Sequence, residues 1–369
     1  MHVPDGFINA PVSVAAGVVA AGAVAGALRG ARFELRDRAA PLAGLVAAFV
    51  FAVQMLNFPV AGGTSGHLLG GALAAVLVGP ATGVLCVAVV LLVQGLLFAD
   101  GGLTALGVNI SLMGVVTVLV AYATFRLLSG VLPAGRASVL GATFLAAFLS
   151  VPVSAVAFTG VYALGGTAEV SLGKVFTAMV GVHLLIGLGE AVITTLTVGA
   201  VLSVRPDLVY AARGPRPSLT RHTVTPATPG QGPAPAAAEP VRDERATTVP
   251  PGPAHHPGGL RSVWLVGLGA TLLCAGVLSF YASAHPDGLE KVAADQGIAD
   301  KEEDHAAADS LLADYGVKGV SGDRLSGGLA GLVGAGGTLA LGTGAFVLLG
   351  RGRSRTEPGP GSSSTGETS

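Results

Sequence analysis

The sequence predicts an all-α membrane protein, a polytopic helical bundle of about seven transmembrane helices followed by a two-helix C-terminal module. Charged residues make up only 12% of its 369 residues, against about a quarter in soluble proteins. The mean hydropathy is +0.68, and several apolar runs are long enough to cross a bilayer as helices. The formal net charge of −1 provides no basic excess, so nucleic acid is not an expected partner.

Nine apolar stretches are the predicted spans. In chain order they are 11–28, 41–58, 68–79, 84–98, 108–127, 139–162, 175–203, 262–283 and 325–350. Seven lie in the first part of the chain, and the last two form the C-terminal module. The 68–79 stretch has about 12 residues, which is short for a crossing helix and also suits a re-entrant helix.

The basic residues indicate how the spans are oriented. Of the 21 Lys and Arg residues, 16 fall in the four segments 29–40, 125–138, 204–261 and 351–369. If 68–79 crosses, all four segments lie on one side of the membrane, and their positive charge identifies that side as the cytoplasm. We therefore expect a multi-pass protein of the inner or plasma membrane with its N-terminus outside and its C-terminus in the cytoplasm. Because no basic residue precedes the first apolar run, we expect a retained helix rather than a cleaved signal.

A proline-rich stretch divides the chain into two modules. Residues 204–261 contain 12 of the 22 prolines and few large apolar residues, which predicts a disordered cytoplasmic linker. It separates a membrane domain, 1–203, from a two-span module, 262–350, that encloses an external acidic segment, 285–324. The Gly/Ser/Pro-rich tail, 351–369, is expected to be disordered.

Enzyme motifs are absent from the sequence. It contains no G-x-x-x-x-G-K-[ST] phosphate loop, no H-E-x-x-H and no G-x-S-x-G. We therefore expect a protein that is not an enzyme, and uphill transport would draw on partner chains or an ion gradient. Cys86 and Cys274 lie in separate apolar runs, so the sequence indicates no disulfide framework and no thiolate metal site.

The most specific feature is the N-terminal sequence Met1-His-Val-Pro-Asp-Gly6. A histidine at position 2 places the α-amino group, the His2 backbone nitrogen and an imidazole nitrogen within chelating reach of one metal ion. Asp5-Gly6 predicts a tight turn that returns the chain towards the bundle. The alternative is that His2 is simply an exposed terminal residue.

His67 is the candidate for a fourth ligand. It lies in a glycine-rich turn that the span pattern places on the same side of the membrane as the N-terminus. Imidazole nitrogen suits divalent nickel, cobalt or copper. Considered alone, His67 could equally be a polar group at a helix end.

Four other polar residues could line the same pocket. Asp100 and Asn109 are candidates for hydrogen bonds that orient the ligands, or they could be ordinary loop caps. His183 and Glu190 lie on one face of a predicted span, where ionisable groups are candidates for function. The glycines beside Glu190 also suit close helix packing, so a structural hydrogen bond is the alternative.

These motifs resemble the CbiM/NikM substrate-binding component of energy-coupling-factor cobalt and nickel transporters. The resemblance covers about 1–203 and follows the family's order: the N-terminal sequence, Gly66-His67, the Gln94 to Thr104 segment and the His183 to Glu190 segment. It implies that the Met1 amine, the backbone and side-chain nitrogens of His2, and His67 bind Co²⁺ or Ni²⁺ in a roughly square-planar site. It implies no ligand role for Asp100, Asn109, His183 or Glu190.

The C-terminal module resembles the accessory CbiN/NikN component, here fused through the linker. His285-Pro-Asp-Gly-Leu-Glu290 matches its PDGLE motif. Together the resemblances imply the metal-capturing subunit of an ABC-type importer. ATPase subunits and a transmembrane coupling (T) subunit would be its partners, and it would support cobalamin biosynthesis. The fused module favours cobalt, with nickel as the alternative.

Two other classes stay open on the residues alone. One is a secondary cation transporter or channel in which His183 and Glu190 form a relay. The other is a membrane sensor that does not transport and whose acidic segment, 285–324, binds a partner protein, although an acidic run is usually a solvated face.

Overall fold

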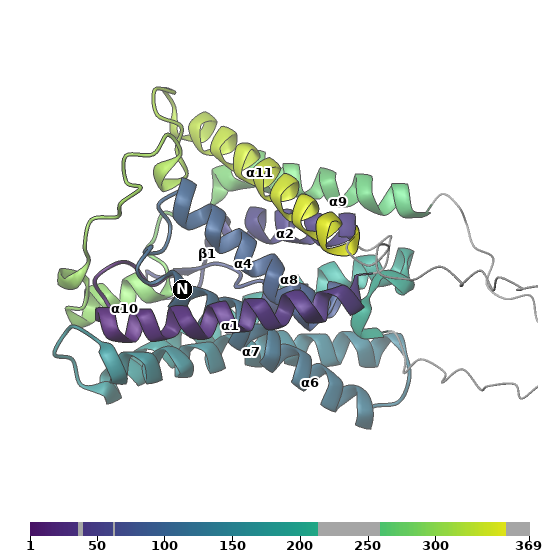
Figure 1. The fold of residues 1–369 in the computed structure, drawn as a ribbon, viewed down its shortest axis with the longest axis horizontal. Helices are drawn as coiled ribbons and strands as arrows, with labels where there is room; N and C mark the ends of the chain where they lie inside the picture. The colour runs from purple at the N-terminus through teal and green to yellow at the C-terminus, as the bar shows by residue number, and fades with distance from the viewer. Residues whose placement is uncertain (36–39, 62, 213–258, 352–369) are drawn as a thin grey trace, which may run out of the picture.

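The computed structural model describes residues 1–35, 40–61, 63–212 and 259–351, and its long helices run along the long axis of one bundle (Figure 1). The longest helices are α1 (Ala10–Glu34), α7 (Arg136–Gly165), α8 (Leu172–Val204) and α11 (Asp323–Arg351). The shorter ones are α2 (Ala40–Gln54), α3 (Gly71–Val78), α4 (Pro80–Leu97), α5 (Leu106–Asn109), α6 (Thr117–Val131), α9 (Gly259–Gly276) and α10 (Gly288–Gln296). The π-helical turns Ile110–Val116 join α5 to α6, and the strands β1 (Phe58–Pro59) and β2 (Ser65–Gly66) form a small hairpin.

The helices confirm the predicted all-α membrane class. Within the described residues, six helices are long and apolar enough to cross a membrane: α1, α4, the continuous run Leu106–Val131, α7, α8 and α11. Two further apolar helices, Ala40–Gln54 and Arg261–Gly276, are shorter. The chain is therefore a multi-pass helical protein with a helical C-terminal region.

Two predicted spans end earlier than their apolar runs. The predicted 41–58 helix ends at Gln54, because Pro59 disfavours helical backbone at Phe58 and both residues pair with β2 instead. The predicted 262–283 helix ends at Gly276. Beyond it the chain turns, and the Ser283 N–H donates to the Asn57 carbonyl at 2.7 Å.

The short apolar stretch crosses the bundle only partly as a helix. Ser65 N–H donates to the Pro286 carbonyl at one end of the bundle, whereas Gly79 lies against the Glu34 carboxylate at the far end of α1. The eight-residue helix α3 rises only about 12 Å, and the extended residues before it supply roughly 20 Å more. The predicted 68–79 helix is thus shorter than expected, because Gly70 has a φ of +80° and breaks the helix there.

Glu190 satisfies the extended backbone of this crossing. Its buried carboxylate accepts the Leu69 N–H at 2.6 Å and the Gly70 N–H at 3.1 Å. Gln54 Nε2 donates to the Leu69 carbonyl at 2.8 Å. Non-helical backbone at membrane depth is tolerated only where protein surrounds it and pairs its polar groups. The carboxylate of Glu190 therefore stabilises this extended backbone.

The C-terminal module packs along α2. Helices α9 and α11 lie beside α2 in Figure 1, and Gly334 of α11 approaches Phe51 so closely that a Cβ atom there would clash with its ring. The Phe51 ring also contacts Phe98 at a centroid distance of 5.3 Å, and Phe98 stacks on Tyr315 at 4.9 Å. The module is therefore joined to the N-terminal domain through side chains as well as through the chain itself.

The packed structure of the N-terminal domain continues beyond the predicted boundary at residue 203. Residues 206–212 form two short 3₁₀ turns, and Val209 is fully buried because Leu208 and its neighbours fold back onto the core. The rest of the predicted 204–261 linker, up to residue 258, and the tail from 352 lie outside the described residues.

We predict that Glu190→Ala lowers the free energy of unfolding by about 3 kcal/mol, because two buried N–H groups lose their acceptor. Chemical denaturation in detergent micelles measures this. The exposed Glu169 provides the control, since Glu169→Ala should change stability by less than about 0.5 kcal/mol. Equal effects of the two substitutions would contradict the structural role of Glu190.

Candidate metal site

The N-terminus lies inside the bundle rather than at its surface. Met1 is 2% exposed and Val3 is fully buried, and the N label in Figure 1 lies among the helices. The Asp5-Gly6 turn, where Gly6 has a φ of +87°, reverses the chain before α1 begins. Ser154 of α7 contacts the Met1 sulfur at 3.7 Å. Residues 1–9 therefore form a plug that enters the bundle from the end where α1 begins.

Side chains hold this plug against the turn that precedes α5. Asn109 binds Val3 twice: its Oδ1 accepts the Val3 N–H at 2.8 Å, and its Nδ2 donates to the Val3 carbonyl at 3.0 Å. The Asp5 carboxylate accepts the Thr104 N–H at 2.7 Å and the Leu103 N–H at 3.2 Å. These hydrogen bonds fix the positions of Val3 and Asp5, and they thereby restrict where Met1 can lie.

The Met1 amine meets two side chains from distant parts of the sequence. Its nitrogen lies 2.5 Å from His67 Nε2 and 2.7 Å from Asp287 Oδ2. His67 Nδ1 lies 2.9 Å from the Leu68 carbonyl. Since a carbonyl only accepts, Nδ1 carries the proton, and the Nε2 lone pair faces the amine. The structure thus brings two of the predicted ligands, Met1 and His67, into direct contact.

The His2 ring lies beside this pair. It stacks on His67 with a centroid separation of 4.9 Å and an interplanar angle of 20°. Its Nδ1 is 3.1 Å from Asp100 Oδ1, and its Nε2 is 3.2 Å from Gln94 Oε1. Burial lowers the pKa of His2 to about 4, although the Asp100 charge opposes the shift, so the ring is neutral near pH 7. A chelate through Nδ1 requires this nitrogen to exchange Asp100 for the metal.

The sequence does not predict Asp287 as a site residue, because its PDGLE motif only identifies the C-terminal module and indicates no contact with the N-terminus. It is the N-cap of α10 and is 7% exposed. Burial alone would raise the pKa of Asp287, but the Met1 ammonium holds it well below its usual range. The carboxylate therefore carries a negative charge inside the site.

The remaining predicted residues lie around the site in different ways. Asp100 and Asn109 contact His2 and Val3 as described, and the second oxygen of Asp100 accepts the Tyr315 hydroxyl at 2.5 Å. His183 is buried on α8, and its Nδ1 donates to the Met179 carbonyl at 2.8 Å. Glu190 binds the backbone that follows His67.

The donor set depends on the chain terminus. No group of three or more His, Cys, Asp or Glu side chains is arranged to hold a metal within the described residues. The Met1 amine is not a side chain, and with it the site has nitrogen donors of the kind that divalent cobalt and nickel accept.

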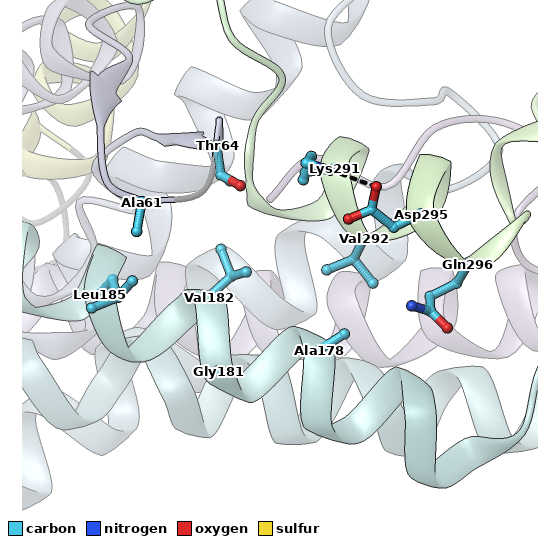
Figure 2. A pocket seen from close by; sticks show the side chains of 10 residues that line it. All are labelled: Ala61, Thr64, Ala178, Gly181, Val182, Leu185, Lys291, Val292, Asp295 and Gln296. Carbon is cyan, nitrogen blue, oxygen red and sulfur yellow. Dashed lines mark hydrogen bonds and ion pairs between the residues drawn. The ribbon is translucent and has the colours of Figure 1, made fainter.

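A cavity of about 280 Å³ lies next to the site, between α8, the hairpin turn and α10 (Figure 2). It is lined by Ala61, Thr64, Ala178, Gly181, Val182, Leu185, Lys291, Val292, Asp295 and Gln296. Its charged groups are Lys291 and Asp295, which pair with each other at 2.5 Å. The cavity contains none of the candidate ligands, so it is a gap beside α10 rather than the metal site.

The fold defines the chain as a multi-pass membrane protein, and comparison with known proteins gives its family. The family described as "Cobalt uptake substrate-specific transmembrane region" (CbiM) matches residues 2–208, and the PDGLE domain matches residues 261–351. The chain therefore belongs to the CbiM family, with a PDGLE domain after it, which confirms the resemblance seen in the motifs.

Three relatives illustrate the family. A protein of Haloquadratum walsbyi named for metal transport is 39% identical over 57% of this chain and 94% of its own length. The fused nickel transport protein NikMN of Rhodobacter capsulatus is 35% identical over 58% and 65%. The cobalt transport protein CbiM of Sorangium cellulosum is 37% identical over 46% and 76%. The chain is thus a membrane component of cobalt or nickel transport rather than an enzyme.

We predict that Asn109→Ala speeds hydrogen exchange at the Val3 amide by roughly 30-fold, because two hydrogen bonds worth about 1 kcal/mol each are lost. Exchange of an N-terminal peptide, followed by mass spectrometry, measures this. Asn57→Ala is the control, since Asn57 contributes only its backbone carbonyl to a bond at the 283 turn. Unchanged exchange in Asn109→Ala would show that the plug is held by other contacts.

Proposed function

We propose that the chain is the substrate-binding subunit of an energy-coupling-factor ABC importer and captures Co²⁺ or Ni²⁺ at a nitrogen chelate formed by Met1, His2 and His67. One observation carries the proposal: the buried Met1 amine lies 2.5 Å from His67 Nε2. A terminal ammonium is rarely buried, because its charge is strongly solvated in water. A site that binds a metal cation through this amine would account for its burial.

Capture replaces the proton of the ammonium with the metal ion. The lone pair of the amine becomes available when the proton leaves, and that of His67 Nε2 already faces the same point. The His2 backbone nitrogen, after loss of its amide proton to solvent, and the His2 ring Nδ1 would complete four nitrogen donors. Asp100, which contacts His2 Nδ1, and Asn109, which fixes Val3, are proposed to orient these donors as outer-shell residues do.

Release requires the plug to move. The external segment covers it: the Glu303 N–H donates to the Asp5 carbonyl at 3.1 Å, and His305 Nε2 lies 3.3 Å from the Gly101 carbonyl. The sequence contains no ATP-binding motif. We therefore propose that ATPase subunits and a transmembrane coupling subunit drive the opening. Both oxygens of the Glu190 carboxylate accept backbone N–H groups. The described residues therefore give no contact that favours a proton or cation relay between His183 and Glu190.

The proposed orientation has the N-terminus outside and the C-terminus in the cytoplasm. Arg29 and Arg32 lie at the end of α1, Arg126 near the end of α6, and Arg136 at the start of α7. Arg136 donates to the Gly199 carbonyl near the end of α8. These residues gather at the bundle end opposite the Met1 site, and positive charge favours the cytoplasmic side.

Cobalt is the proposed substrate, and a cobalt importer would support cobalamin biosynthesis. Nickel is the second candidate, because the fused relative in Rhodobacter capsulatus is named for nickel whereas the Sorangium cellulosum relative is named for cobalt. The fused module therefore does not separate the two metals. We propose that the two modules, 1–203 and 262–350, act together through the contacts along α2.

We predict that His2→Ala abolishes stoichiometric Co²⁺ binding, since the ring nitrogen that closes a chelate with the Met1 amine and the backbone nitrogen is lost. Equilibrium dialysis of the purified full chain measures binding. His285→Ala is the matched control, because His285 is exposed and belongs to the same end of the bundle. Full binding by His2→Ala would contradict the chelate, and metal uptake into vesicles by the chain alone would contradict the need for ATPase partners.

A further inference from the structure

The two carboxylate oxygens of Asp287 make contacts with different parts of the chain. Oδ1 accepts the Glu290 N–H at 2.8 Å and caps α10, while Glu290 Oε2 accepts the Asp287 N–H at 2.9 Å. Oδ2 faces the Met1 amine at 2.7 Å and lies 3.4 Å from His67 Nε2. Capping needs only one oxygen. The second oxygen is therefore directed into the metal site by a separate set of contacts.

The three donor atoms are spaced as ligands of one ion. Met1 N, His67 Nε2 and Asp287 Oδ2 form a triangle with sides of 2.5, 2.7 and 3.4 Å. Atoms at these separations can all lie about 2.0–2.1 Å from a single point, which is the usual bond length from a divalent transition metal to nitrogen or carboxylate oxygen. Binding would therefore require little movement of Asp287.

We propose that Asp287 is an oxygen ligand of the transported metal, so that the PDGLE module completes the substrate site of the N-terminal domain. This inference rests on the proposed function, because it assumes that the metal binds at Met1 and His67. It adds a ligand to the nitrogen set and gives the C-terminal module a direct part in capture.

Charge supports the assignment. A divalent ion held by neutral amine and imidazole nitrogens and by the deprotonated His2 backbone nitrogen would leave one uncompensated positive charge in a buried site. The Asp287 carboxylate, 7% exposed, cancels it at contact distance. In the metal-free protein the same oxygen pairs with the Met1 ammonium, so the site holds a cation in both states.

The neighbouring residues of the motif position the carboxylate. Ser65, two residues before His67, donates from its N–H to the Pro286 carbonyl at 2.9 Å and from its hydroxyl to the His285 carbonyl at 2.7 Å. Gly288 packs so closely on α8 that a Cβ would lie 2.7 Å from Ile186 Cδ1. Leu289 is 1% exposed in the core beneath α10.

These contacts couple the module to the loop that carries His67. Because the same short segment binds Ser65 and presents Asp287, a shift of α10 moves a ligand and its neighbouring loop together. Opening of the module would thus remove one donor and weaken the hold on the metal, which is the kind of change that release requires.

Asp287→Asn tests the proposal, because asparagine caps a helix as well as aspartate but lacks the charged oxygen. Co²⁺ affinity by equilibrium dialysis and the visible d–d spectrum are measured on the full chain. We expect binding to stay 1:1 while the affinity falls at least about tenfold and the spectrum shifts. Asp287→Ser, which also caps, is the second variant in case the first folds poorly, and its loss should be the same.

Glu290→Ala and Asp295→Asn are the controls. The first removes half of the capping box but leaves Asp287 in place, and the second removes a carboxylate of α10 that pairs only with Lys291. Both should bind Co²⁺ as the wild type does. The proposal is overturned if Asp287→Asn keeps the wild-type affinity and spectrum or binds more tightly, or if Glu290→Ala reproduces its loss. Failure of the proposed function is distinct, since His2→Ala would then leave binding intact.

Discussion

The structure depends on the burial of one positive charge, the Met1 ammonium, within a helical membrane bundle. A buried charge must be paired, and this one is paired by Asp287 and contacts His67. The pairing explains why the first nine residues enter the bundle and why α10 of the C-terminal module lies over α8. In this CbiM-family protein, the N-terminal domain and the PDGLE domain therefore meet at the Met1 nitrogen.

Two irregular segments reach this point, and buried side chains satisfy the backbone of each. Asn109 and Asp5 hold the N-terminal plug, while Glu190 and Gln54 hold the extended backbone after His67. Irregular backbone inside a membrane protein is stable only with such partners. These four side chains thereby hold the two segments where Met1 and His67 meet.

Much of this arrangement can be predicted from the sequence. Apolar runs reveal the helices, and His2 next to a terminal amine indicates a chelate from local chemistry alone. Asp287 could not be predicted as a site residue, because its contact with Met1 joins opposite ends of the chain and depends on how α10 packs. The extended backbone at Leu69 was hidden for a similar reason: its N–H groups are paired by Glu190, a partner that no local pattern connects to it. His67 could be proposed as a partner because the span pattern puts its turn on the same side of the membrane as the N-terminus, whereas no sequence pattern connects Asp287 or Glu190 to the segments that they contact.

The central claim is that the Met1 amine binds the transported metal. Anomalous diffraction at the cobalt edge, from crystals of the Co²⁺-loaded full chain, tests it most directly. The account predicts one strong peak about 2.1 Å from Met1 N and His67 Nε2, with Asp287 Oδ2 at a similar distance. A peak elsewhere, such as among the carboxylates of the 285–324 segment with the Met1 amine still paired to Asp287, would contradict it.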